Sequence, residues 1–93
     1  MNIDKLKGWE NYREWCFDIQ NVLVIETVWA AVSGYAVEDT TPASLKKQKN
    51  EKAKAIICLT LEPQVKSYVV QTTTAKEAWD TLERTFKDQG VNS

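Results

Sequence analysis

A stripe of apolar side chains at helical spacing runs through residues 12–23 of this 93-residue chain. The stripe follows the spacing i, i+3, i+4, i+7, i+10 and i+11, and its members are Tyr12, Trp15, Cys16, Ile19, Val22 and Leu23. This pattern lines one face of an α-helix with apolar residues and leaves polar residues on the other side. Asn11 is a favourable N-cap, and Glu14 stands where its carboxylate could reach the cap amide. We therefore expect a first helix over about residues 11–24.

The apolar stripe drifts after Leu23, because the segment that follows has apolar residues on most sides. This drift indicates a kink or a short break near residues 25–27. A second, short helix over about residues 27–33 should follow, and Gly34 is well placed to end it in a left-handed conformation. Residues 35–41 read as a loop.

A third helix is predicted over about residues 42–61, since Thr41 suits an N-cap and Pro42 suits the first helical position. The first half of this segment is polar and the second half, "AKAIICLTL", is largely apolar. We therefore expect the first half to project into solvent. The second half should be buried, with Ile56 and Leu59 near the core.

Two further helices follow from the capping signals in the last third of the chain. Pro63 begins a short helix over about 63–70, because proline is tolerated in the first helical turn. Thr74 and Glu77 have the spacing of a capping box at the start of a helix over about 75–88. The last helix has an apolar stripe formed by Ala75, Ala78, Trp79, Leu82 and Phe86.

The expected fold is all-α: a compact, single-domain bundle of about five helices. Hydrophobic residues make up 43% of the chain and charged residues 27%, which is ordinary for a globular protein. The tryptophans lie at helical spacing, so we interpret them as core residues, with a ligand cage as the alternative. The predicted core is Tyr12, Trp15, Ile19, Leu23, Trp29, Ile56, Leu59, Trp79, Leu82 and Phe86.

The sequence offers little for catalysis. It has no histidine, which removes the commonest general base, and it has no phosphate-binding or dinucleotide-binding motif. Cys16 and Cys58 are too far apart for a metal knuckle or a redox pair, so we expect two reduced thiols packed as small apolar groups. We therefore predict no enzyme activity, no metal and no cofactor.

The overall charge and hydropathy give no general attraction to nucleic acid or to a membrane. The net charge is −1, and no apolar run approaches the roughly 20 residues that span a bilayer. The start of the chain, "MNIDKLKG", lacks the apolar centre of a signal peptide. We expect a cytoplasmic protein, and we expect nucleic acid to be an unlikely partner for this chain alone.

One cluster of basic residues lies within the predicted third helix, at Lys46, Lys47, Lys49 and Lys52. At 100° per residue these side chains spread over more than one face of a helix, so a solvated surface is the simpler interpretation. The alternative is a patch that binds polyanions. Because exposed aromatic residues are not interleaved with the lysines, the signal for nucleic-acid binding is weak.

Two motifs in the chain resemble Gag polypeptides of copia-type retrotransposons. The first motif is formed by Leu6, Gly8, Asn11, Tyr12, Trp15, Leu23, Trp29, Val32 and Gly34. The second comprises Ala55, Ile56 and Leu59, followed by the segment "TAKEAWDTLERTF" at residues 74–86. The resemblance extends over about residues 5–87, and it is the ordered pair of motifs that makes it specific.

The resemblance implies a fold like the amino-terminal domain of retroviral capsids and a structural role in the shell of virus-like particles. It also implies that the partners are other copies of the chain, or other Gag chains, held by weak repeated contacts. By analogy with such shells, the assembly surface would include Trp9, Arg13, Asp18 and Gln20. The alternative is a captured Gag fragment that acts as a monomeric or dimeric interaction module and interferes with the assembly of a retroelement.

Overall fold

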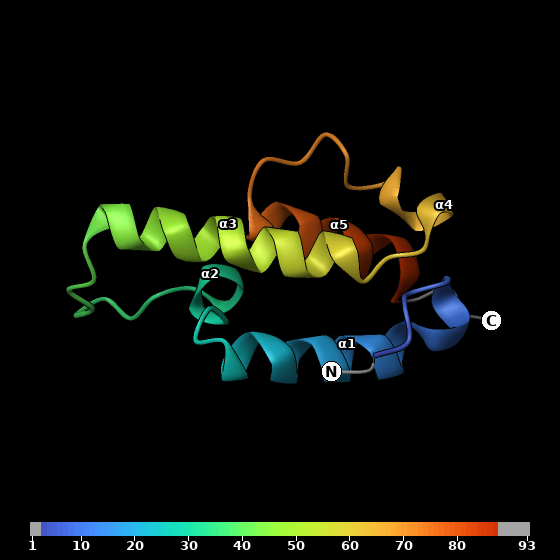
Figure 1. Ribbon diagram of the computed structural model, residues 1–93, viewed down its shortest axis with the longest axis horizontal. Coiled ribbons are helices and arrows are strands. Elements are labelled where there is room, and N and C mark those ends of the chain that lie inside the picture. The colour runs from blue at the N-terminus through green and yellow to red at the C-terminus, as the bar shows by residue number, and fades with distance from the viewer. Residues whose placement is uncertain (1–2, 88–93) are drawn as a thin grey trace.

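A computed structural model describes residues 3–87 of the chain (Figure 1). Five helices follow one another along the chain: α1 (Trp9–Ile25), α2 (Ala30–Ser33), α3 (Ala43–Leu59), α4 (Pro63–Lys66) and α5 (Ala75–Phe86). Within residues 3–87 there is no β-strand, and only one isolated bridge joins two extended positions. The prediction of an all-α bundle is therefore confirmed.

Helices α3 and α5 pack against each other more extensively than any other pair. Figure 1 shows α1 along one side of this pair and α4 on the opposite side, with the short α2 between α1 and α3. The amino-terminal half of α3 and the loop before it extend beyond the other helices. This extension agrees with the polar composition of that half, which has little apolar surface to bury.

The core forms where α1, α3 and α5 meet, and Trp15 lies at its centre with 1% of its surface exposed. The ring of Trp15 stacks on Trp79 at 5.8 Å between ring centroids, and Trp79 meets Trp29 edge-on at 5.2 Å. Of the residues predicted to form the core, six are buried and three others are partly buried. The buried six are Tyr12, Trp15, Ile19, Leu23, Leu82 and Phe86, and the partly buried three are Trp29, Ile56 and Trp79.

The prediction that Leu59 belongs to the core is wrong, because 70% of its surface is exposed. The buried positions near the end of α3 are Ala53 and Ile57, and Leu61 follows in the next turn. With 3.6 residues per turn, a residue two positions after Ile57 lies roughly 200° around the helix and points away from the core. The apolar run concealed this phase, because almost every position in it is hydrophobic.

Leu6 is a core residue that the sequence did not reveal, and it is completely buried. Its backbone forms an isolated parallel bridge with Leu61. The Leu6 N–H donates to the Thr60 carbonyl at 2.9 Å, and the Glu62 N–H donates to the Leu6 carbonyl at 3.0 Å. The segment before α1 is thereby fixed to the junction between α3 and α4.

Asn11 does not cap the first helix as predicted. Helix α1 begins two residues earlier, with Gly8 as its N-cap, and Asn11 has non-helical backbone angles (φ −123°, ψ 15°) within the first turn. The Asn11 side chain accepts a hydrogen bond from the Lys7 N–H at 2.9 Å and donates one to the Lys5 carbonyl at 3.0 Å. Its amide therefore holds the incoming chain, which a capping rule based on spacing alone does not anticipate.

The predicted break after α1 is present, and it centres on Thr27, whose φ of 61° lies in the left-handed region. Helix α2 begins only at Ala30, later than predicted, because the break occupies the intervening residues. Gly34 follows α2 with φ 103° and ψ 153°. Its φ is positive, as expected, but its ψ lies outside the left-handed helical region.

The other helices begin close to their predicted starts, but three of them are shorter than predicted. Helix α3 begins at Ala43 with Pro42 as its extended N-cap, so the Thr41 side chain does not cap it. Helix α4 ends at Lys66, and turns take the place of its predicted continuation to residue 70.

The start of α5 was predicted correctly from its capping signal. The Thr74 hydroxyl accepts a hydrogen bond from the Glu77 N–H at 3.1 Å. The Glu77 carboxylate bonds to the N–H and hydroxyl of Thr73, one residue before the position that a capping box requires. The helix ends at Phe86, and its predicted end at residue 88 lies outside the described part of the chain.

Candidate functional site

A groove of about 710 Å³ runs between α1 and α5. Its lining residues are Trp9, Glu10, Tyr12, Arg13, Cys16, Phe17, Gln20, Glu83, Phe86 and Lys87. We call this surface the α1–α5 groove. It arises because both helices pack against α3 and contact each other only weakly.

The floor of the α1–α5 groove is apolar and aromatic. Tyr12 and Phe86 are nearly buried there, with ring centroids 6.3 Å apart. Two aromatic side chains stand at the exposed margin: Trp9 is 53% exposed and Phe17 is 70% exposed. Large aromatic rings are seldom left this exposed without a function, so the groove is a candidate contact surface.

The titratable groups on the groove floor are held in their neutral forms. The Cys16 thiol lies 3.8 Å from the Tyr12 hydroxyl. Burial raises the pKa of Tyr12, and burial also raises the pKa of the Cys16 thiol. Because the thiolate is the reactive form of cysteine, the groove presents a weak nucleophile at neutral pH.

The rim of the groove is polar and includes charges of both signs. The ammonium group of Lys87 pairs with the Glu83 carboxylate at 3.2 Å, one helical turn apart. Glu10 and Arg13 line the rim from α1 and are both exposed. An apolar floor within a polar rim resembles the anatomy of a protein–protein contact surface.

Three of the four residues that the sequence suggested as an assembly surface, Trp9, Arg13 and Gln20, line this groove. The fourth, Asp18, is partly buried and is not among the lining residues. Phe17 was missed, although it is the most exposed aromatic residue on α1. Its position outside the buried stripe was the signal that could have identified it.

The lysines of the suggested polyanion patch are divided by their local contacts. Lys46 lies over the Tyr35 ring, 4.5 Å from its centroid, and Lys52 pairs with Glu26 at 2.9 Å. Lys47 is exposed and Lys49 is partly buried. At least two of the four side chains therefore already have partners within the molecule.

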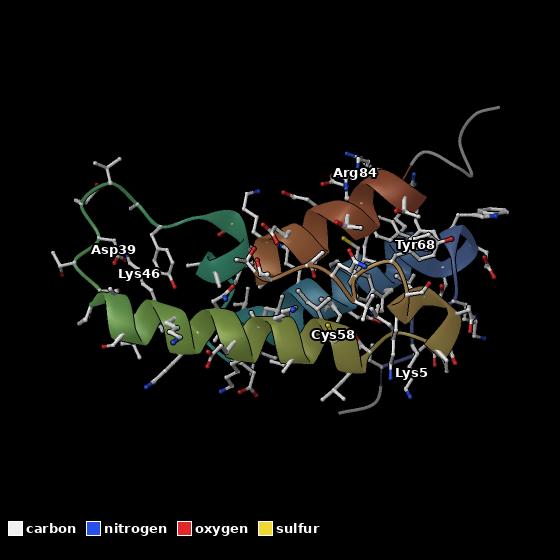
Figure 2. All side chains as sticks on the ribbon, turned by 90° about the horizontal axis from the view of Figure 1, so that it is seen from above. Lys5, Asp39, Lys46, Cys58, Tyr68 and Arg84 are labelled. Carbon is white, nitrogen blue, oxygen red and sulfur yellow. The ribbon has the colours of Figure 1, made fainter. Side chains whose placement is uncertain are left out.

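Asp39 adds a negative charge beside this group of lysines. Figure 2 shows Lys46 at one end of α3, close to the loop that carries Asp39. Hydrogen bonds from Thr41 hold the pKa of Asp39 below its usual range, and Lys46 and Lys49 lower it further. A carboxylate in this position reduces the attraction of the neighbouring lysines for an anion.

Residues 3–87 contain no group of three or more histidine, cysteine, aspartate or glutamate side chains that could hold a metal ion. Over the same part of the chain, every helix is too short or too polar to cross a membrane.

Comparison with protein families gives one informative result. The family model described as "gag-polypeptide of LTR copia-type" matches residues 19–93, which is most of the chain. Comparisons with curated proteins and with solved structures give no significant match. The match begins at Ile19, so it includes α2 to α5 and the second half of α1, while the residues from Leu6 to Trp15 lie before it. The chain belongs to the family of Gag polypeptides of copia-type LTR retrotransposons.

Proposed function

We propose that this chain is a capsid domain, of the amino-terminal type, whose copies associate to build the shell of a cytoplasmic virus-like particle. Membership of the Gag family supports a structural, capsid-like role rather than catalysis. The partners would be copies of the same chain or other Gag chains. Shells of this kind can be built from many weak contacts, since repetition makes up for low individual affinity.

The observation that carries this proposal is the exposed aromatic margin of the α1–α5 groove. Trp9 and Phe17 lie on one helix, outside a core that already contains aromatic rings from the same helix. Keeping such side chains in water brings no benefit to folding. Their exposure is explained if another molecule covers them in the assembled state.

The proposal can be tested with the purified chain. Sedimentation velocity over a range of concentrations should show reversible association, and electron microscopy at high concentration should show rings, tubes or shells. A chain that remains a monomer at every concentration and salt would contradict self-assembly. That result would favour the alternative, a Gag fragment that binds another Gag chain and interferes with its assembly.

We further propose that the lysines of α3, Lys46, Lys47 and Lys49, contribute to polyanion binding or to assembly. Their clustering on one helix supports this role, and their internal contacts limit its strength. Replacing all three with glutamate should weaken one of the two properties. Unchanged polyanion binding and unchanged assembly in that variant would exclude the role.

A further inference from the structure

The charges of the molecule are separated between two pairs of helices. Helices α1 and α5, which form the α1–α5 groove, carry six acidic and three basic residues. Helices α3 and α4 carry six basic residues and one acidic residue. The small net charge of the chain therefore hides an acidic groove and a basic surface formed by other helices.

The basic helices carry a second exposed apolar surface. A hollow of about 320 Å³ lies where the end of α3 meets α4, and its lining residues are Lys54, Cys58, Leu59, Lys66, Val69 and Val70. Leu59 is 70% exposed and Val70 is 73% exposed. We call this surface the α3–α4 edge, and Figure 2 shows Cys58 marking it at the end of α3 remote from Lys46.

The α1–α5 groove and the α3–α4 edge have complementary properties. Each combines a hollow with projecting apolar side chains: Trp9 and Phe17 at the groove, and Leu59 and Val70 at the edge. The charged residues that line the edge are both lysines, whereas the helices of the groove are acidic. Figure 1 shows α1 and α4 on opposite sides of the α3–α5 pair, so the two surfaces are presented by opposite sides of the molecule.

We infer that the α1–α5 groove of one copy receives the α3–α4 edge of another copy. This inference rests on the proposed function, and it specifies which surfaces meet. A contact between two grooves would set acidic helices against acidic helices, and a contact between two edges would set lysines against lysines. Such like-charge contacts are unfavourable, whereas opposite charges favour docking of groove to edge.

This contact is heterologous, because it joins two different surfaces of identical molecules. Every copy in a chain of such contacts keeps one groove and one edge free at its two ends. Repetition of the contact therefore gives a closed ring if the rotation closes, and an open array if it does not. A shell needs this property, whereas a contact between identical surfaces would stop at a dimer.

Two variants with complementary defects provide the test. The groove variant carries Trp9→Ser with Phe17→Ser, and the edge variant carries Leu59→Ser with Val70→Ser. All four side chains are more than half exposed, so both variants should fold, which circular dichroism and thermal melting would verify. Val37→Ser with Leu45→Ser is a matched control, because it removes exposed apolar groups that line neither surface.

Each variant alone should associate roughly tenfold more weakly or worse than the unmodified chain in sedimentation velocity, since it has lost two apolar anchors. An equimolar mixture should form a one-to-one complex that grows no further. In that mixture, the intact edge of the groove variant meets the intact groove of the edge variant. The control should associate like the unmodified chain, and added salt should weaken association by screening the charges.

The possible results separate this inference from the proposed function. If the unmodified chain associates but either variant associates equally well, or if the mixture of folded variants stays monomeric, groove-to-edge docking is wrong while self-assembly stands. If the unmodified chain never associates, the proposed function is wrong, and the inference falls with it.

Discussion

The two faces of α1 contain the same kinds of side chain in opposite surroundings. Tyr12 and Trp15 face inward and are almost completely buried, whereas Trp9 and Phe17 face outward with more than half of their surface exposed. The indole N–H of Trp15 donates to both the carbonyl and the hydroxyl oxygen of Thr60, at 3.1 Å in each case. Angular position around the helix therefore decides whether an aromatic residue stabilises the fold or remains available to a partner.

Replacing Trp15 by alanine should produce the largest effect on stability. The change removes the ring that stacks on Trp79 and leaves a cavity at the centre of the molecule, which typically costs about 3–5 kcal/mol of unfolding free energy. Urea denaturation followed by circular dichroism would measure the loss. Trp9→Ala is the matched control on the same helix, and equal losses in the two variants would contradict the distinction between the inner and outer faces.

The pair Ile57 and Leu59 extends the comparison to α3. Ile57 is completely buried and Leu59 is 70% exposed, although both belong to one apolar run. Ile57→Ala should reduce the unfolding free energy by about 2–5 kcal/mol, whereas Leu59→Ala should change it by less than about 0.5 kcal/mol. Denaturation midpoints would show the difference, and a large loss for Leu59→Ala would return that residue to the core.

The start of α5 gives the smallest expected effect, because its polar contacts are exposed. The N–H and hydroxyl of Thr73 donate to the Glu77 carboxylate and lower its pKa. A lowered pKa in the folded state means that the carboxylate stabilises the fold above its ordinary pKa. This contribution is lost as the pH falls through the folded pKa.

The pH dependence can be measured by melting the unmodified chain and the variant Glu77→Gln from neutral to acidic pH. The unmodified chain should melt at a slightly higher temperature at neutral pH, and the two curves should converge in acid. The other carboxyl groups titrate in both proteins and cancel in the comparison. A difference that persists unchanged at low pH would rule out a role for the Glu77 charge.

The clearest sequence signals were those in which capping and periodicity agreed. Helix α5 begins where Thr74 caps it, and its apolar stripe faces the core. In α3 the periodicity was hidden by consecutive apolar residues, so Leu59 was placed on the wrong face. Leu6 was missed for a different reason: a single residue in an extended segment has no period, and its burial depends on a bridge to Leu61.

The groove was only partly predictable, because it depends on how two helices are placed. The resemblance to capsid proteins suggested Trp9, Arg13 and Gln20 on α1, and these residues do line the groove. The opposite wall includes Glu83 and Lys87, and no local pattern indicates that the end of α5 faces α1. A contact between elements that are distant in sequence requires the packing angle, which periodicity does not provide.

The bridge between Leu6 and Leu61 has a consequence for the order of folding. Residues near the start of the chain complete their backbone hydrogen bonds only with residues that are synthesised much later. While the chain emerges from the ribosome, α1 can form local helical turns, but the segment before it has no partner until the end of α3 has appeared. Closing this long loop is an entropic cost that precedes the native contacts, so we expect tertiary structure to form late in translation.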